Sequence, residues 1–451
     1  MRMDPTLMSA TQAAEAIRAG RLSSENLVQA CLARVAETEP VVQAWAHLDG
    51  DHALAQAREL DRIRRAGRAT GALHGVPVAL KDIVDTADMP TQRGSVIFSG
   101  RQSGRDARLV ERLREAGAVI MGKTRTTELA YLHPTVTTNP HDPSRTPGGS
   151  SSGSAAAVAA RHVPLAIGTQ TGGSVVRPAS FCGAFGFKPS RGIIPRTGVF
   201  RTSITLDQIG GFANTLEDMA LLVDAIGCYD QDDPASFARP RPRHLAGARA
   251  EVPVEPDFAW FDMPYHDRLD ADARAGLESV LDALGDRVER FPAAPQLVGL
   301  TDVHKVIYDY EIAENMQDIA RDHGGTLSQE MRAALERGTA ISRAQYCEAI
   351  EIKASAEAFF VDHFNDFDAI LAPSASGQAL PLSAGNTGDA VYCTIWTLAG
   401  LPCLTLPVLV GADELPIGVQ LIGAREQDDR LMRTAAWMQA ALTGSAAREE
   451  V

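Results

Sequence analysis

Short apolar runs alternate with segments of helical periodicity along most of this chain. "VPVAL" (Val76–Leu80) and "AVIM" (Ala118–Met121) are two such runs, and the segment between them ends in a helical pattern at Ala107–Gly117. Runs that are apolar throughout are typical of strands buried on both faces. Strands that alternate with helices predict an α/β fold: a large, mostly parallel mixed β-sheet, covered by helices on both faces.

The same pattern extends over the rest of the chain. Ser9 and Gln12 fit a capping box, and Gly20 is a natural helix stop. We expect the remaining elements in this order: a helix between Ser9 and Gly20, a helix from Ser23 or Ser24, a strand ending near Thr169, a helix capped at Asn214 or Thr215, helical segments at 269–284 and 302–364, strands at 367–374 and 401–410, and a last helix at 428–442.

We expect one domain over residues 1–451. It divides into a helical preface (1–65), a catalytic core (66–228), a variable helical region that builds the substrate pocket (229–365) and a return to the core sheet (366–451). Residues 230–256 are rich in Pro, Arg and Asp and predict a loop or insertion.

Composition excludes several classes of protein. Lys and Arg number 43 against 57 Asp and Glu, a net charge of −14, which disfavours nucleic acid as a partner. No apolar run approaches the roughly 20 residues of a membrane span. The six cysteines form no C-x-x-C pair, which argues against a zinc site or a disulfide framework. We therefore expect a cytoplasmic protein with no membrane partner. We also expect a monomer or homodimer that uses no metal and no cofactor.

Two motif matches carry little weight. Gly117–Thr124 satisfies the P-loop pattern, but its variable residues are the strand "AVIM", so nothing is left to form a phosphate cradle. Gly149–Gly153 satisfies G-x-S-x-G, centred on Ser151. A nucleophile elbow must follow a strand, whereas "NPHDPSRTP" precedes this one.

A third group of residues is more informative. Lys81 closes a buried strand, where desolvation favours the neutral amine that a general base needs. The strand that ends at Thr169 is followed by Gly172, Gly173 and Ser174. Small residues there let successive backbone N–H groups converge, as in an oxyanion hole. A surface lysine and a loop serine are the alternatives for each residue taken alone.

These stretches resemble the amidase signature family. The resemblance rests on "LHGVPVALKDIVDTADMPTQRGS", "TPGGSSSGSAAAVAA", "GTQTGGSVVRPASFCGAFGFKPS" and "LPIGVQLIG", and it covers nearly the whole chain. It implies a Ser–cis-Ser–Lys triad with Ser174 as nucleophile, Ser150 as bridging serine and Lys81 as base. It also implies a cis peptide between Gly149 and Ser150.

The resemblance implies roles for the neighbouring residues too. The backbone amides of Thr171, Gly172, Gly173 and Ser174 would hold the oxyanion. The supporting residues would be Ser151, Thr169 and Gln170. Ser152 is a departure, because many relatives have Gly there, and Gln170 replaces a common Asp.

Arg177 bears on substrate choice. "GGSVVR" resembles the malonamidase and biuret-type branch, in which the resemblance implies that this arginine meets a substrate carboxylate. Alternatively, Arg177 ties down its own loop. Tyr308, Tyr310, Tyr392 and Trp396 offer aromatic pocket walls, and core packing explains them equally well.

The predicted function is hydrolysis of a linear amide through an acyl-enzyme, with a small-molecule amide or carbamate as partner and a small carboxylated amide as favoured substrate. Aryl amides, esters and carbamates (urethanes) are alternatives on the same triad. An alternative of another class is the A-type subunit of a tRNA-dependent amidotransferase, which has this fold, passes ammonia to a partner and works only in a complex.

Overall fold

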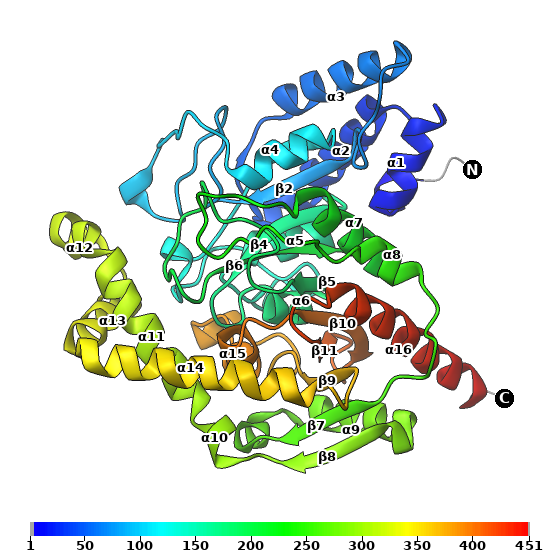
Figure 1. Ribbon diagram of the computed structural model, residues 1–451. Helices are drawn as coiled ribbons and strands as arrows, with labels where there is room; N and C mark the ends of the chain where they lie inside the picture. Colours follow the sequence, from blue (N-terminus) through cyan, green and yellow to red (C-terminus); the bar gives the residue numbers. More distant parts are fainter. Residues whose placement is uncertain (1–3, 450–451) are drawn as a thin grey trace.

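The computed structural model describes residues 4–449, and its centre is one large sheet. Within these residues eleven strands hydrogen-bond in the order β1-β3-β2-β4-β6-β5-β10-β11-β9-β7-β8. Their bounds are β1 (Trp45–Leu48), β2 (Pro77–Lys81), β3 (Val119–Thr124), β4 (Leu165–Gln170), β5 (Phe185–Lys188), β6 (Gln208–Ala213), β7 (Phe258–Asp262), β8 (Val288–Pro292), β9 (Ala369–Pro373), β10 (Cys403–Val410) and β11 (Pro416–Ile422). In Figure 1 the sheet crosses the molecule from β2, near the blue N-terminal helices, to β7 and β8 at the bottom.

Helices surround this sheet. They are α1 (Ala10–Arg18), α2 (Ser24–Val42), α3 (Gly50–Arg65), α4 (Arg108–Glu115), α5 (Ser152–Ala159), α6 (Val176–Cys182), α7 (Leu216–Ile226), α8 (His244–Arg249), α9 (Ala271–Leu284), α10 (Pro295–Val298), α11 (Leu300–Asn315), α12 (Gln317–His323), α13 (Gln329–Ala340), α14 (Arg343–His363), α15 (Val391–Leu398) and α16 (Asp428–Glu449). None of the helices described is both long and apolar enough to cross a membrane.

Two hydrophobic cores lie on the two faces of the sheet. Side chains alternate along a strand, so Val78 and Leu80 of β2 join the larger core, which also holds α4 and α7. Ala79, between them, joins the second core together with α2 and α5. Burial on both faces explains why these strands read as continuous apolar runs, and the predicted α/β class with a large mixed sheet is confirmed.

Parallel and antiparallel pairing occupy different parts of the sheet, apart from the edge strand β1, which pairs antiparallel with β3. The pairs β3–β2 and β2–β4 on one flank and β9–β7 and β7–β8 on the other are parallel. From β4 through β6, β5, β10 and β11 to β9 every pair is antiparallel. The sheet therefore holds more antiparallel pairing than the alternation of strands and helices suggests. A short connection of this antiparallel part is the turn from β10 to β11, and two neighbouring strands joined by so few residues must run antiparallel.

Several predicted elements match the structure and several strands were missed. Ser9 and Gln12 form the capping box, and Ser23 and Thr215 cap α2 and α7. Strands β1, β5, β6, β7, β8 and β11 were not predicted from the sequence. They are four to seven residues long, and β5, β6 and β11 contain glycine, which weakens the hydrophobic pattern of these three.

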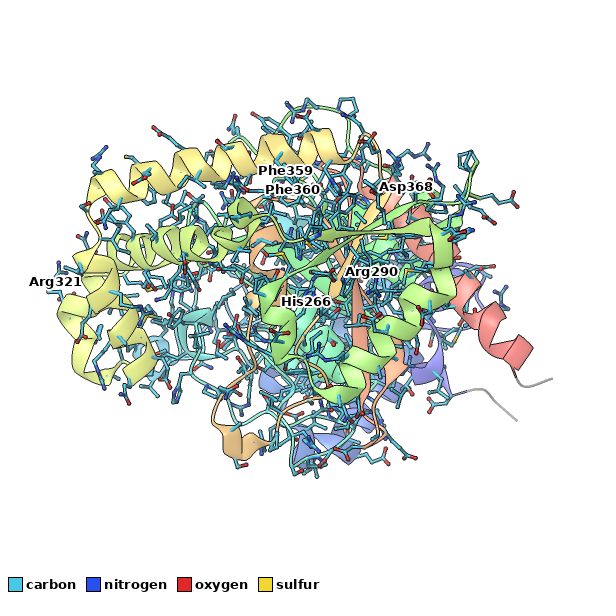
Figure 2. All side chains as sticks on the ribbon, turned by 90° about the horizontal axis from the view of Figure 1, so that it is seen from below. His266, Arg290, Arg321, Phe359, Phe360 and Asp368 are labelled. Atoms are coloured by element: carbon cyan, nitrogen blue, oxygen red, sulfur yellow. The ribbon has the colours of Figure 1, made fainter. Side chains whose placement is uncertain are left out.

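The Pro- and Arg-rich stretch at 230–256 is largely loop but contains α8, which packs closely on α16. A Cβ added at Gly247 would lie 2.2 Å from the Asp429 backbone oxygen, so glycine permits this approach. The stretch 302–364 forms four helices, α11, α12, α13 and α14, and they project to one side of the molecule in Figure 1. Figure 2 shows Arg321 on α12 at the outer end of this group, with Phe359 and Phe360 on α14 nearer the sheet. Phe360 packs against Trp396 of α15.

Strands from all four predicted segments of the chain take part in the one sheet. The division of the chain into those segments stays a prediction.

Candidate active site

The parallel pair β2–β4 positions the first residues of the site. Lys81 is the last residue of β2, and Gln170 is the last residue of β4. Because the two strands run parallel, their carboxyl ends meet at one edge of the sheet, where sites of open α/β sheets form. The segment Gly149–Ser151 leads into α5, and after α5 the chain continues into β4. The segment therefore lies at the edge of the sheet where β4 ends.

Lys81 is buried completely and touches two hydroxyl groups. Its Nζ is hydrogen-bonded to Ser150 Oγ at 2.7 Å and to Thr169 Oγ1 at 2.8 Å. Burial lowers the pKa of the Lys81 ammonium from its ordinary value to about 7, against an opposing effect of the Asp207 charge. A large fraction of this lysine is therefore neutral near pH 7, the form that accepts a proton.

The peptide bond between Gly149 and Ser150 is cis. Its two residues are held by their carbonyl groups: Arg177 Nη2 donates to Gly149 O at 2.6 Å, and Thr126 Oγ1 and Thr127 N donate to Ser150 O. Ser150 is thereby fixed with its hydroxyl toward Lys81.

The other two serines of this cluster have structural contacts. Ser151 Oγ lies 3.3 Å from both the backbone N and the backbone O of Thr169 and bridges α5 to the end of β4. Ser152 Oγ donates to Gly148 O at 2.7 Å. Of the three adjacent serines, only Ser150 contacts the lysine among the described residues.

Ser174 lies in the loop between β4 and α6 and is the partly exposed residue of that loop. Within residues 4–449, its hydroxyl and the backbone N–H groups of Thr171, Gly172, Gly173 and Ser174 have no hydrogen-bond acceptor. The next two N–H groups, of Val175 and Val176, both donate to Gln170 Oε1. The loop thus leaves four consecutive backbone N–H donors without an acceptor among the described residues. The side chain of Gln170 accepts from the next two.

Gln170 also ties the loop to α15. Its Nε2 donates to Thr397 Oγ1 at 3.0 Å, and Thr397 Oγ1 in turn lies 2.7 Å from Gly172 O. On the other side, His304 Nε2 is 2.7 Å from Thr171 O. Three elements, β4, α11 and α15, therefore fix the Thr171–Ser174 backbone.

Several of these contacts were not predicted from the sequence. They involve Asp207, His304, Thr387 and Thr397. Thr397 and Thr387 lie more than 200 residues from their partners, so no local pattern marks them. Asp207 stands in "TLDQIG" directly before β6, and a carboxylate at a strand start inside an apolar stretch was the available signal.

Arg177 is buried beneath the loop. It donates to Gly149 O and, at 3.3 Å, to Thr387 Oγ1, while its Nε and Nη1 have no partner within the described residues. Through these contacts Arg177 holds the backbone at Gly149 in place. A contact with a substrate carboxylate stays a prediction.

The four aromatic residues differ in position. Tyr392 and Trp396 are buried in the larger core. Tyr310 stacks on Tyr346 at 4.3 Å between ring centres. Tyr308 stands beside the site, because its ring meets His304 edge-on at 5.8 Å and its hydroxyl lies 3.3 Å from Thr202 Oγ1. Core packing therefore accounts for Tyr392 and Trp396.

No group of three or more His, Cys, Asp or Glu side chains that could hold a metal ion occurs among the described residues. The groups that the structure brings together at this edge of the sheet are hydroxyls, a buried amine and backbone amides.

Comparison with known proteins gives consistent matches. The Amidase family model matches residues 26–432. The A subunit of glutamyl-tRNA(Gln) amidotransferase from Chloroflexus aggregans is 34% identical over 94% of this chain and 94% of its own length. The corresponding A subunit from Natranaerobius thermophilus is 32% identical over 92% of both chains.

Solved structures agree with these matches. A structure described as a vestigial protein complex that reveals the origins of an s-triazine catabolic enzyme superposes with a TM-score of 0.90 at 28% identity, over 96% of this chain and 98% of that one. The peptide amidase of Stenotrophomonas maltophilia superposes with a TM-score of 0.83 at 29% identity, over 97% of both chains.

Two predictions are wrong in the light of these relatives. A stand-alone hydrolase of a small carboxylated amide was the favoured function, whereas the curated relatives bear the name of the alternative, one subunit of an amidotransferase. The second wrong prediction concerned partners. We expected a monomer or homodimer with a small molecule as its sole partner and no nucleic acid, whereas the names of these relatives refer to a tRNA and to one subunit of a complex. Net charge describes only this chain's own average surface, so it does not exclude nucleic acid from an assembly that contains other subunits.

The family is settled by the extent of the match. The Amidase model spans most of the chain, and the relatives are matched nearly end to end at over 30% identity. The chain is an enzyme that acts on amides, and it belongs to the amidase signature family.

Proposed function

We propose that this chain is the A subunit of a tRNA-dependent amidotransferase of the glutamyl-tRNA(Gln) type. The observation that carries the proposal is the end-to-end match to the curated A subunits, at 34% identity over 94% of both chains. In this role the chain releases ammonia from an amide, and a partner subunit uses that ammonia to amidate a tRNA-bound amino acid.

The chemistry follows from the site. Ser174 Oγ attacks the amide carbonyl and forms a C–O bond, while its proton passes through Ser150 to neutral Lys81. The free amides of the Thr171–Ser174 loop stabilise the oxyanion. The C–N bond then breaks, and ammonia leaves with the proton that returns through Ser150. Water hydrolyses the acyl-enzyme by the same relay in reverse.

The contacts of Lys81 support this relay. A serine hydroxyl 2.7 Å from a buried lysine is within the reach that proton transfer needs. The lowered pKa of Lys81, to about 7, leaves a base of suitable strength near neutral pH. Ser174, partly exposed and without an acceptor among the described residues, is free to meet a substrate carbonyl.

Reconstitution tests the assignment. The purified chain is assayed for ammonia release from L-glutamine and L-asparagine, alone and together with the partner subunits of a related amidotransferase and glutamyl-tRNA(Gln). We expect slow release by the chain alone, a clear increase in the complex, and amidated tRNA as product. Ser174→Ala is the matched inactive control.

The opposite result would reject this assignment. It would be full turnover of simple amides by the single chain, unchanged by partner subunits and tRNA. Carbamate cleavage by the same triad stays a prediction, and a carbamate beside the two amides in this assay tests it.

A further inference from the structure

Asp207 lies beside the site and takes no part in the relay described above. It directly precedes β6, whose first residue, Gln208, pairs with Gln170 at the end of β4. This register brings Asp207 level with Thr171, the first residue of the loop that carries Ser174. The side chain of Asp207 is 7% exposed.

Its carboxylate is surrounded by donors. Thr171 Oγ1 donates to Oδ1, and the backbone N–H groups of Thr202 and Ser203 donate to Oδ2 at 2.7 and 3.0 Å. Thr202 Oγ1 also donates to Oδ1, at 3.1 Å. A carboxyl group that receives two backbone N–H bonds acts as an acceptor. The ionised carboxylate can accept all of these hydrogen bonds at once. Burial works against this by raising the pKa of Asp207.

The charged and titratable groups around Asp207 leave it without an ion pair among the described residues. Arg196 donates to the Asp207 backbone O but pairs its guanidinium with Asp233. The other groups come from α11: His304 binds Thr171 O, Tyr308 contacts Thr202 Oγ1, and Glu311 accepts from Ser203 Oγ. The Asp207 carboxylate therefore accepts hydrogen bonds from neutral donors alone among the described residues.

Lys81 needs such a charge during turnover. When it takes up the serine proton it becomes a buried ammonium, and its contacts are two neutral hydroxyls. No carboxylate within the described residues forms a salt bridge with it. The negative charge of Asp207 raises the pKa of Lys81, against the larger lowering that burial causes. Low dielectric around the site lets that charge act beyond contact distance.

We infer that Asp207 is a positioning residue with two effects on the reaction: its bond to Thr171 fixes the loop that carries Ser174, and its charge stabilises the protonated Lys81 formed during turnover. This inference rests on the triad proposed above. It adds to that triad a fourth residue, which touches neither substrate nor nucleophile.

The test measures the rate at which a fluorophosphonate labels the full-length chain, as a function of pH. Labelling joins Ser174 Oγ to phosphorus and expels fluoride, so it reports activation of the nucleophile without requiring the natural amide. In Asp207→Asn we expect the acid limb of the profile to move down by about one pH unit, because the ammonium loses its favourable charge. We also expect the plateau rate to fall about tenfold or more, since a weaker base removes the proton less readily.

Asp218 provides a matched control. It is also a buried carboxylate, and it accepts two backbone N–H bonds and one threonine hydroxyl bond, from Ala10 and Thr11. Asp218→Asn removes a comparable structural carboxylate away from Lys81. We expect lower thermal stability and an unchanged acid limb. An equal shift of the limb in Asp218→Asn would overturn the inference.

A second variant separates the two effects. Thr171→Val removes the hydroxyl bond but keeps the Asp207 charge, so the plateau should fall about tenfold while the limb stays in place. An unchanged plateau would refute the positioning effect even if Asp207→Asn fails to fold. A limb that stays in place in folded Asp207→Asn would refute the charge effect. Failure of the triad itself looks different, because Lys81→Met would then keep the wild-type rate and limb.

Discussion

Two strands of the same sheet end in a buried lysine, and the surroundings of those two lysines differ. Lys81 closes β2 and Lys188 closes β5, and both side chains are fully buried. Lys188 Nζ contacts acceptors only: Gln208 Oε1 at 2.7 Å, Pro189 O at 3.3 Å and Leu401 O. Lys81 Nζ contacts two hydroxyls, which can donate as well as accept.

The difference shows that burial alone does not make a base. Burial lowers the pKa of both ammonium groups. Three acceptors around Lys188 are satisfied only by a protonated amine, so its surroundings oppose that effect. Hydroxyl partners satisfy Lys81 in either state, because Ser150 and Thr169 can reverse the direction of their hydrogen bonds. We therefore expect Lys188 to hold the fold together and Lys81 to exchange protons.

Removing the amine of Lys81 should have the largest effect. In Lys81→Met the serine proton has no final acceptor, so the fluorophosphonate labelling rate should fall about 10³-fold. Thermal stability should change little, because the desolvation cost of the amine disappears while the hydroxyls of Ser150 and Thr169 lose a partner. Labelling kinetics and a thermal melt measure both quantities. A labelling rate within a few-fold of wild type would refute the comparison.

Lys188→Met should have the opposite profile. The change leaves Gln208 Oε1 buried without a donor, which costs about 1–3 kcal/mol of unfolding free energy, and leaves Leu401 O with the weak Cys403 thiol donor alone among the described residues. The labelling rate per folded molecule should change little. Thermal or urea denaturation measures the loss. A stable Lys188→Met protein with a low labelling rate would instead place Lys188 in the chemistry.

The pH dependence of wild type sharpens the comparison further. Protonated Lys81 cannot take a proton, so labelling should rise about tenfold per pH unit below its pKa and level off above it. The pKa of about 7 sets the midpoint. The Lys188→Met variant should keep the same curve. A midpoint near the ordinary lysine value, well above pH 9, would mean that Lys81 is solvated.

The smallest effect should come from Ser152. Its hydroxyl bonds Gly148 O and reaches neither lysine. Ser152→Ala should cost about 1 kcal/mol of stability and leave the labelling rate nearly unchanged. Ser150→Ala, two residues earlier, should lower the rate nearly as far as Lys81→Met. Similar rates for the two alanine variants would show that the serine next to Lys81 is not the proton carrier.

Part of the fold could be predicted from local patterns. Strands β2 and β4 are apolar up to the polar residues that end them, and Ser9, Ser23 and Thr215 cap their helices through contacts three residues away. Strand β8 could not be predicted in this way. β8 is exposed or partly exposed along its length, so its pairing with β7, rather than a buried apolar pattern, makes it a strand.

Local sequence patterns also indicated only part of the function. The motifs around Lys81, Ser150 and Ser174 point to amide chemistry, and the family match supports that level. The preference for a free-standing enzyme was drawn from net charge, the lack of a basic patch and the departures at Gln170 and Arg177. Charge sums over all surfaces, and Arg177 proved to be buried against Gly149 O. Neither feature carries information about partner subunits.

By itself the sequence determined which residues are available for chemistry: a lysine at the end of an apolar strand, a serine cluster before a helix and a glycine-rich turn after another strand. Tertiary structure alone decided what surrounds them. Lys188 meets Leu401, 213 residues away, and Gln170 meets Thr397, 227 residues away. The pKa of a buried group depends on the donors, acceptors and charges within a few ångströms, and those neighbours come from distant parts of the chain.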